Sequence, residues 1–336
     1  MGYMKIGVVV PNWNGEQLLG ECLDSLHRQT LPGEVIVVDN GSQDGSVQLI
    51  EDYYPHAHIL QLEDNYGFAG GVNAGIEYAL KQGADYIALC NNDAVAEENW
   101  LERLVAVAEA SSDIGVVTGK ILAYDGETID STGDEYSIWG TPFPRGRGEA
   151  DHGQYDGARH REVLAASGGG SLYRADLFVD VGFFDEWFFA YYEDVDISFR
   201  ARLAGWRLRY APEAIVYHHI GATSEKLGDF RLQHMYKNFP VVFMKNMPGK
   251  LFWGYGWRVL GVFGFKMLQL IKKLKLILLI KLLFKIIIHL PKAFTQRHRI
   301  QRNRRVDPSY IDGFLHQAPP PTQSGLIKIT TKFPVK

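Results

Sequence analysis

Short apolar runs alternate with helix-like segments through the first hundred residues of the chain. Buried strands are expected at residues 5–11, 35–39, 58–62 and 85–90. After the first strand, Leu18, Cys22 and Leu26 recur at helical spacing, and similar patterns follow the second and third strands. Strands and helices that alternate at these lengths predict a parallel sheet with right-handed crossovers. The sequence therefore predicts an α/β protein whose strand-end loops gather on one edge of the sheet.

Polar and glycine-rich loops follow these strands, and ligands bind at that edge of an open α/β sheet. The edge is expected to hold Asn12, Asn14, Asp39, Ser42, Asn65, Gly67 and Asp93. Each loop also fits a plain turn, because Asn, Asp and Gly favour turns. The glycines at 70, 71 and 75 equally fit close helix packing. Four polar loops on one edge together favour a ligand site.

The fourth strand ends in Asn91-Asn92-Asp93, three oxygen-bearing side chains in a row. Hard cations such as Mg²⁺ take oxygen ligands and are commonly held by one or two carboxylates with substrate phosphates. Asp93 therefore fits a metal anchor. The alternative is that Asn92 and Asp93 cap a helix that begins near Glu97, since Asn and Asp are preferred there.

Beyond residue 100 the alternating pattern gives way to segments of other kinds. A helix is expected at 100–110 and a strand at 115–118, followed by an irregular surface segment at 125–161 rich in Gly, Asp, Arg and Pro. Long loops of this kind are usually functional or mobile. Residues 166–174 indicate a strand whose glycines, Gly169 among them, allow a ligand or another backbone to approach. A helix at 175–181 follows.

An aromatic stretch at 182–192 runs directly into Glu193 and Asp194. Val195, Phe199 and Leu203 recur on one face and predict an amphipathic helix with acidic residues in its first turn. The helix macrodipole alone accounts for such acids. A carboxylate partly desolvated by aromatic side chains, however, has a raised proton affinity that suits a general base.

A pair of short strands, 206–210 and 214–217, is expected to end at His218-His219. A single histidine is more often structural than a ligand. Two at a strand end, in a chain that already offers Asp93, make a second metal contact plausible.

Composition and charge divide the 336-residue chain into three parts. The net charge is -4, yet no Asp or Glu occurs from Val241 through Val306, where Lys and Arg recur. We expect a catalytic domain at 1–240, a basic amphipathic helical region at 241–306 and a mobile tail at 307–336. Two cysteines and the lack of a secretory leader predict a cytoplasmic location.

The basic region predicts a helix that lies in a membrane interface. Cationic side chains fall on one side and apolar ones mostly on the other: Lys281, Lys285, His289 and Lys292 against Leu279, Leu282, Leu283, Ile286, Ile287 and Leu290. The lysines interrupt any run near the roughly 20 apolar residues that a spanning helix needs. Lysines toward anionic headgroups fit a peripheral location on the inner face of the cell membrane.

Two alternatives concern the same region. The helix could pack in a core with its lysines in solvent. A cationic patch could also bind nucleic acid, and it comprises Arg297, Arg299, Arg302, Arg304 and Arg305. The adjoining apolar helix and the lack of a known nucleic-acid fold favour a membrane and no nucleic acid.

Six ordered motifs within about residues 5–224 carry a family resemblance. They are VPNWN (10–14), VDNGSQDGS (38–46), NYGFAGGVN (65–73), NND (91–93), GFFDE (182–186) and YEDVDISFR (192–200). Together they resemble family 2 glycosyltransferases, especially the rhamnosyltransferase-like branch. The resemblance implies the GT-A nucleotide-diphospho-sugar transferase fold, a Rossmann-like, mostly parallel sheet flanked by helices, here with a C-terminal amphipathic helical extension.

The resemblance also implies roles for residues of this chain. Asp194 looks like the base that takes the acceptor proton, with Glu193 as runner-up, and Asp93 and His218 look like ligands of Mg²⁺ or Mn²⁺. The family usually has Asp at both ends of its metal triplet, whereas this chain has Asn91 at the first. Candidate nucleotide-sugar-binding residues are Pro11, Asn12, Asn14, Asp39, Ser42, Asn65, Gly67, Gly71, Asn73, Asn92 and Gly169.

The function that this implies is inverting, metal-dependent transfer of rhamnose or another hexose from a nucleotide-diphospho-sugar to a lipid-linked or polysaccharide acceptor, in cell-surface glycan biosynthesis. An alternative is a weak or inactive membrane-associated nucleotide-sugar-binding protein. A dinucleotide-dependent oxidoreductase would share the strand and helix pattern. The first strand, however, leads into Pro-Asn-Trp-Asn-Gly and lacks GxGxxG.

Overall fold

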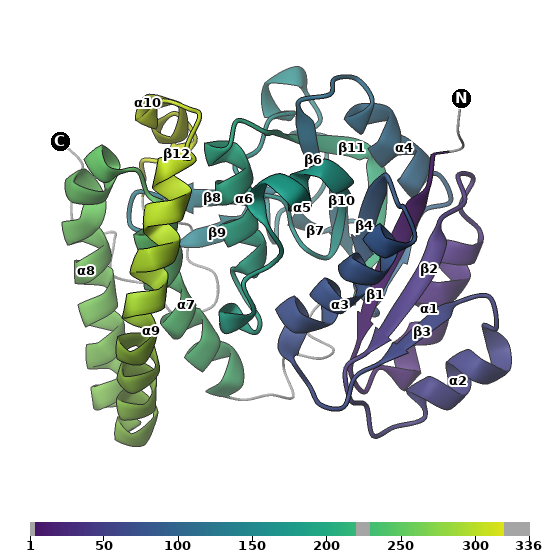
Figure 1. Cartoon of the computed structure of the whole chain (residues 1–336), viewed down its shortest axis with the longest axis horizontal. Coiled ribbons are helices and arrows are strands. Elements are labelled where there is room, and N and C mark those ends of the chain that lie inside the picture. Colours follow the sequence, from purple (N-terminus) through teal and green to yellow (C-terminus); the bar gives the residue numbers. More distant parts are fainter. Residues whose placement is uncertain (1–3, 220–228, 319–336) are drawn as a thin grey trace.

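A nine-stranded sheet forms the centre of the part of the chain up to His218 (Figure 1). We describe residues 4–219 and 229–318 of a computed structural model. The strand order is β3-β2-β1-β4-β10-β6-β11-β5, with β7 paired to β6. Strands β1 to β4 are mutually parallel, whereas β10 runs antiparallel to β4 and β6. The predicted α/β sheet with parallel strands at its start is therefore present.

The first half of the chain follows the predicted alternation closely. Its elements are β1 (Ile6–Asn12), α1 (Glu16–His27), β2 (Glu34–Asp39), α2 (Ser46–Tyr53), β3 (His58–Gln61), α3 (Gly67–Lys81), β4 (Tyr86–Cys90), β5 (Ala94–Ala96), α4 (Trp100–Ala108) and β6 (Ile114–Ala123). The short strand β5 was not predicted. It lies just before the position near Glu97 at which the sequence suggested the start of a helix.

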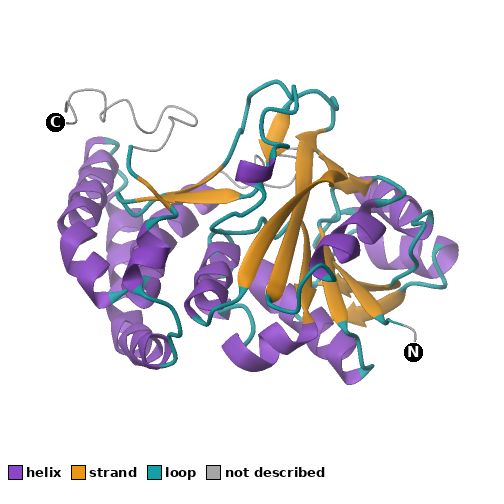
Figure 2. Ribbon diagram, turned by 90° about the horizontal axis from the view of Figure 1, so that it is seen from above, coloured by secondary structure: helices purple, strands orange, loops and turns teal. Residues whose placement is uncertain are grey.

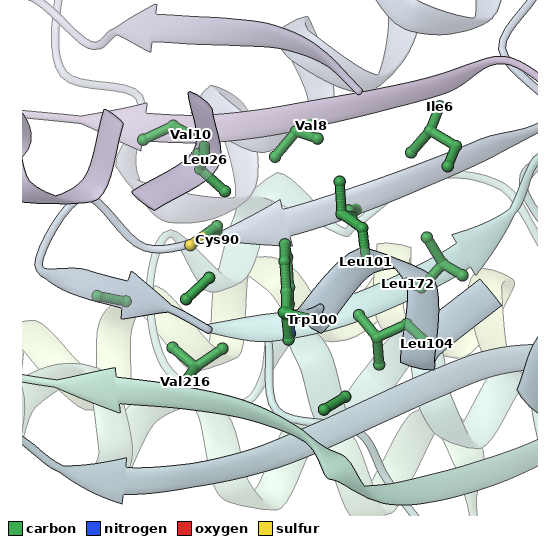
Figure 3. Packing of buried hydrophobic residues seen from close by; sticks show 14 of the residues in the cluster. Ile6, Val8, Val10, Leu26, Cys90, Trp100, Leu101, Leu104, Leu172 and Val216 are labelled. Atoms are coloured by element: carbon green, nitrogen blue, oxygen red, sulfur yellow. The ribbon is translucent and has the colours of Figure 1, made fainter. Parts of the chain in front are cut away.

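Two apolar layers sandwich the sheet, which explains why its strands are continuous apolar runs. On one face Val8 and Val10 pack with α1 and α4, and Trp100 lies fully buried at the centre of that layer (Figure 3). On the other face Val9 packs with Val72 of α3. Strands buried on both faces need apolar residues at every position rather than at alternate ones.

The segment at 125–161 differs from the irregular surface loop that we predicted. It contains β7 (Ile129–Ser131), β8 (Asp134–Ser137), β9 (Pro142–Pro144) and the 3-10 helix η1 (Ala158–His160). Ser131, Asp134 and Tyr136 are buried. The segment lacks visible periodicity because its strands have only three or four residues each.

The remaining elements of the sheet domain are β10 (Gly170–Arg174), α5 (Ala175–Val181), η2 (Glu186–Phe188), α6 (Glu193–Leu203) and β11 (Arg207–His218). Two expectations need correction here. The predicted strand pair is one continuous strand, β11, with an irregularity between Ala211 and Ile215. Helix α6 is not amphipathic, since nearly every residue is buried. Its buried arginines are tolerated because they are paired, Arg200 with Asp196 and Arg202 with Glu162.

Three long helices pack beside the sheet domain as a group: α7 (Asp229–Asn246), α8 (Gly249–Lys272) and α9 (Leu276–Arg302). Figure 2 shows this group on one side of the molecule and the large sheet on the other. Helix α7 contacts α6, α8 and α9. The domain boundary expected at residue 240 falls inside α7. In the described ranges, no helix is both long and apolar enough to cross a membrane.

The tail was expected to be mobile from residue 307, but residues 307–318 are packed. They form α10 (Pro308–Asp312) and β12 (Leu315–His316), and Ile311 and Leu315 are buried. Strand β12 joins β8 and β9 in a second, three-stranded sheet. Residues 319–336 lie outside the described part of the chain.

Candidate active site

The ends of β1 and β2 bring the first two polar loops together. Asn12 and Asp39 are direct partners in the parallel register. The Asn12 amide donates to Asp39 Oδ1 at 3.1 Å and to Ser42 Oγ at 3.3 Å, and the Ser42 backbone N–H donates to Asp39 Oδ2. The backbone N–H of Asn14 donates to Ser42 Oγ at 2.9 Å. The loops thus form one hydrogen-bonded unit, with Asn14 exposed at its outer side and Pro11 half-buried.

The third loop is joined to the second through Asn40, which sequence reasoning did not single out. The Asn40 amide donates to the Gly67 carbonyl at 2.8 Å and to Asn65 Oδ1, and its Oδ1 accepts the Tyr66 N–H. Gly67 has a φ of +74°, a conformation that favours glycine. Gly71 lies against Asn40, where a Cβ would stand 3.2 Å from the amide nitrogen. Both glycines therefore let the start of α3 approach the sheet edge.

The Asn91-Asn92-Asp93 triplet lies between β4 and β5 and caps no helix. Helix α4 begins at Trp100 with Asn99 as its N-cap, so the capping interpretation is wrong. Asn92 donates to Asn12 Oδ1 at 2.7 Å and so ties the triplet to the first loop. Asp93 is buried and faces His218.

His218 lies between two carboxylates. Its Nε2 is 3.1 Å from Asp93 Oδ1 and its Nδ1 is 2.9 Å from Asp130 Oδ2. Arg147 pairs with the other oxygen of Asp130 at 2.6 Å. Burial alone lowers the pKa of His218, but the bonds to Asp130 and Asp93 outweigh it and raise the pKa to about 10. Burial raises the pKa of Asp130, yet His218 and Arg147 hold it below its ordinary value.

This donor set fits a divalent cation that shares its coordination with a diphosphate. In the described residues no group of three or more His, Cys, Asp and Glu side chains forms a metal cage by itself. Mg²⁺ is commonly held by one or two carboxylates together with substrate phosphates and water, which Asp93 allows. His218 could add a ligand to a bound cation through Nε2, which must first lose its proton. Asp130 supplies the carboxylate that commonly orients a metal-ligating histidine.

Asp194 stands in the first turn of α6 and is linked to the triplet through two glycines. Its carboxylate accepts the Gly168 N–H at 3.2 Å and the Val195 N–H at 2.8 Å. The next residue, Gly169, accepts the Asn91 N–H with its carbonyl, and a Cβ on Gly169 would lie 3.1 Å from the Asn91 amide. The predicted base and the first residue of the predicted metal triplet therefore contact two adjacent glycines.

A further acid, Asp134 of β8, interacts with Asp194. Burial and the negative charge of Asp194 raise the pKa of Asp134 to about 7. Burial also raises the pKa of Asp194, although the N–H groups of Gly168 and Val195 oppose this effect. Glu193 is buried with one oxygen unpaired, and burial together with Asp194 raises its pKa well above the ordinary value. The raised pKa values mean that Asp134, Glu193 and Asp194 do not all carry a negative charge at neutral pH.

Asn73 has a different place from the other candidates. Its amide donates to the Phe184 carbonyl and to Glu186, and its Oδ1 accepts the Phe184 N–H. Asn73 thus joins α3 to the loop before α6. His219 stacks on Tyr124 with ring centroids 3.6 Å apart, so the two adjacent histidines have separate surroundings.

Sequence reasoning missed Asp130, Asp134 and Arg147. All three come from the segment at 125–161, whose short strands gave no periodic signal. The only available signal was the unusual number of acidic and basic residues in a segment that we read as surface loop.

Comparison with known proteins adds independent findings. The sequence pattern of "Glycosyl transferase family 2" matches residues 7–182, just over half of the chain. The N-acetylglucosaminyl-diphospho-decaprenol L-rhamnosyltransferase of Mycobacterium tuberculosis is 31% identical over 205 residues, which cover 56% of this chain and 67% of that protein.

Two solved structures are similar in fold. The mannosyltransferase PcManGT from Pyrobaculum calidifontis, in complex with GDP-Man and Mn²⁺, gives a TM-score of 0.54 at 15% identity and covers 90% of this chain and 86% of that one. GalNAc-T7 with UDP, GalNAc and Mn²⁺ gives 0.56 at 17% identity, with coverage of 72% and 48%. The expected GT-A fold is confirmed.

Proposed function

Because the chain belongs to glycosyl transferase family 2, we propose that it is an inverting, metal-dependent transferase of rhamnose or another hexose. The donor is a nucleotide-diphospho-sugar, and the acceptor is a hydroxyl of a lipid-linked or polysaccharide glycan of the cell surface. One observation carries this proposal: Asp194 and Asn91, the first residue of the triplet that ends in Asp93, contact the adjacent glycines Gly168 and Gly169.

In the proposed reaction Asp194 removes the proton from the acceptor hydroxyl. The acceptor oxygen forms a bond to the anomeric carbon while the bond from that carbon to the diphosphate oxygen breaks, which inverts the configuration. Asp194 suits this role because burial raises its pKa and hence its proton affinity. The Gly168 N–H holds its carboxylate in place.

On the opposite side, Asp93 and His218 would hold Mg²⁺ or Mn²⁺, whose charge stabilises the departing diphosphate when bound. The imidazole of His218 is oriented for this role by Asp130 at 2.9 Å. The loops built on Asn12, Asp39 and Asn65 would surround the nucleoside. Asn12 and Asn92 contribute by fixing those loops, because their side chains already bond to each other.

We also propose that the protein binds the inner face of the cell membrane through α8 and α9. Each helix exposes one apolar stripe at helical spacing: Trp253, Trp257, Leu260, Leu268 and Ile271 on α8, and Ile277, Ile280, Phe284, Ile287, Ile288 and Phe294 on α9. These side chains are 44–81% exposed. Large apolar side chains that are exposed together along a helix commonly mark an interaction site. Lys272, Lys273 and Lys281 lie exposed beside the stripes and suit anionic headgroups.

The exposed stripe of α9 differs from the side that the sequence indicated. Leu282 is buried, and Leu279, Leu283 and Ile286 pack with Tyr236 of α7. His289 is also buried and stacks on Trp187 at 3.9 Å, so it faces no headgroup. The arginine patch is partly engaged as well, since Arg297 donates to two carbonyls of the chain and Arg305 pairs with Asp180.

Donor turnover with and without metal tests the proposed function. The purified chain is incubated with dTDP-rhamnose or a UDP-hexose and with a lipid-linked or polysaccharide glycan as acceptor, in the presence of Mn²⁺, Mg²⁺ or a chelator. Release of nucleoside diphosphate that needs the metal is expected. Binding of a donor without turnover under any of these conditions would favour the alternative, an inactive nucleotide-sugar-binding protein, for which Asn91 in the triplet is the suggestive feature.

A further inference from the structure

The loop before Asp194 has a backbone that side-chain-bearing residues rarely adopt. Phe189, Tyr191 and Tyr192 have φ values of +67°, +69° and +75°. Such conformations are unfavourable for residues with a side chain and persist only where the surroundings fix them. Tyr192 is the N-cap of α6, so its conformation sets the direction in which Glu193 and Asp194 leave the loop.

The surroundings that fix this loop come from α7. The side-chain amide of Asn238 donates to three loop carbonyls, those of Phe188 at 3.0 Å, Ala190 at 2.9 Å and Tyr191 at 2.7 Å. Asn238 is fully buried. A carbonyl that loses its donor is costly where water cannot replace it, and the Ala190 and Tyr191 carbonyls receive their hydrogen bonds from this one fully buried amide.

Two neighbours of Asn238 contact the same loop. His234 Nδ1 is 3.2 Å from the Phe188 carbonyl, and Lys237 Nζ donates to the Trp187 carbonyl at 2.8 Å. Burial and the charge of Lys237 lower the pKa of His234 to about 4, so the neutral ring can donate from Nδ1. Positions 234, 237 and 238 lie on one face of a helix. Helix α7 therefore presents a row of donors to the loop.

On its other side the loop touches the start of α3. The Ala69 N–H donates to the Phe189 carbonyl at 3.1 Å, and a Cβ on Gly67 would lie 2.4 Å from that carbonyl oxygen. The loop that carries Asp194 is thus held between the expected nucleotide loop and α7. Helix α7 itself packs between α6 and the pair α8 and α9 (Figure 1).

We propose that Asn238 is a positioning residue for Asp194. It acts by holding the loop at 188–191 with positive φ at Phe189 and Tyr191, so that α6 begins with Asp194 aimed at the acceptor oxygen. This inference rests on the proposed role of Asp194 as the base. Without the Asn238 donors the loop relaxes toward ordinary backbone conformations, and the Asp194 carboxylate moves away from its partner Gly168.

The test compares Asn238→Leu with Asn246→Leu. Asn246 is a matched control because it is also fully buried in α7, but its amide donates to Asp196 and to the Val242 carbonyl and does not bond to the loop. Asn238→Leu is expected to lower kcat about 10- to 100-fold, since a 1 Å misplacement can cost roughly that much. The Kd of the donor should stay within about twofold, and Asn246→Leu should lose thermal stability but keep its kcat.

Equal kcat values in the two variants, or a loss for Asn238→Leu that appears only in donor affinity, would overturn the proposal. If either leucine variant does not fold, Asn238→Asp and Asn246→Asp keep the side-chain shape, remove the donors and are judged by the same criteria. Hydrogen exchange of the peptide 186–196 gives a readout independent of activity. It should become faster in the Asn238 variant alone, and unchanged exchange there would contradict the proposal even if the wild-type chain transfers no sugar.

Discussion

Asp130 and Asp134 are neighbouring acids on the short strands β7 and β8, yet the fold gives them opposite properties. Asp130 bonds to His218 and Arg147, and these partners favour its charged form. Asp134 accepts a hydrogen bond from Ser131 but has the charge of Asp194 nearby, which favours its neutral form. Burial raises the pKa of both carboxyl groups and is the largest single influence on each, and their partners decide whether that effect is overcome, as at Asp130, or reinforced, as at Asp134.

The raised pKa of Asp134 makes a prediction about stability and pH. Between about pH 4 and pH 7 the folded chain binds a proton that the unfolded chain releases, so this contribution to stability is present at low pH and lost as pH rises through 7. Asp134→Asn should therefore match the wild-type melting temperature at about pH 4 and exceed it at pH 8. The gain should be a few degrees, because 1 kcal/mol corresponds to roughly 2–4 °C in proteins of about this size.

Asp125 provides a control for that experiment, because its pKa is shifted in the direction opposite to that of Asp134. Its pKa is lowered because its carboxylate accepts the N–H groups of Thr128 and Glu127. Asp125→Asn should therefore give no gain at pH 8. A melting temperature of Asp134→Asn that follows the wild-type value at every pH would contradict the account of Asp134.

Asp130 makes a prediction about metal affinity, which rests on the proposed function. Asp130→Asn should weaken Mn²⁺ binding, measured by calorimetry in the presence of UDP, by about 10- to 100-fold, because a carboxylate that orients a ligating histidine commonly has that effect. Asp151→Asn is the control: Asp151 pairs with Lys120 in the same part of the chain. Equal affinities in the two variants would contradict an orienting role for Asp130.

At the scale of elements, α8 and α9 combine two kinds of surface. Their inner sides pack with α7 through Tyr236, Met267 and Leu282, whereas their outer stripes are left exposed. Truncation before α8 would therefore remove packing partners of α7 as well as the apolar stripes. Substitution of exposed residues separates the two effects.

Replacement of Ile277, Ile280 and Phe284 by Ser should reduce co-sedimentation with anionic phospholipid vesicles by at least about tenfold, because each buried apolar side chain contributes roughly 1.5–3 kcal/mol. These side chains are 64–73% exposed, so the melting temperature should change little. The control replaces Tyr53 and Val179 by Ser. These two side chains are at least as exposed as those of α9, but they lie on α2 and α5 of the sheet domain. Equal sedimentation of both variants would contradict membrane binding through α9.

At the scale of the whole molecule, sequence patterns predicted the strands of the sheet but not the contacts between distant segments. The strands that start the sheet were predictable, because a strand buried on both faces must be apolar throughout, as Val8, Val9 and Val10 are. The gathering of Asn12, Asp39 and Asp93 on one edge followed from parallel topology alone. Contacts between distant segments could not be predicted in this way. The hydrogen bond between Asp130 and His218 joins positions 88 residues apart. The sequence of the three-residue strand β7 contains no local pattern that predicts this contact.

Ligand binding to the whole chain gives a further prediction. If the loops at the sheet edge hold the nucleotide, UDP or dTDP with Mn²⁺ should raise the melting temperature, because a ligand that binds only the folded state stabilises it by about 2.7 kcal/mol at 100 times its Kd. AMP with Mn²⁺ serves as the comparison. An equal shift with AMP would indicate nonspecific metal binding instead of a nucleoside diphosphate site.

The central claim is that Asp194 and Asp93 act on one sugar from opposite sides, and Asp194→Asn tests it most directly. The measurement is sugar transfer, together with donor Kd, for the wild type and this variant, whose side chain keeps its shape and can still accept the Gly168 N–H. The account predicts that transfer falls by at least about 10²-fold while donor affinity stays unchanged. Near-normal transfer by Asp194→Asn would contradict it.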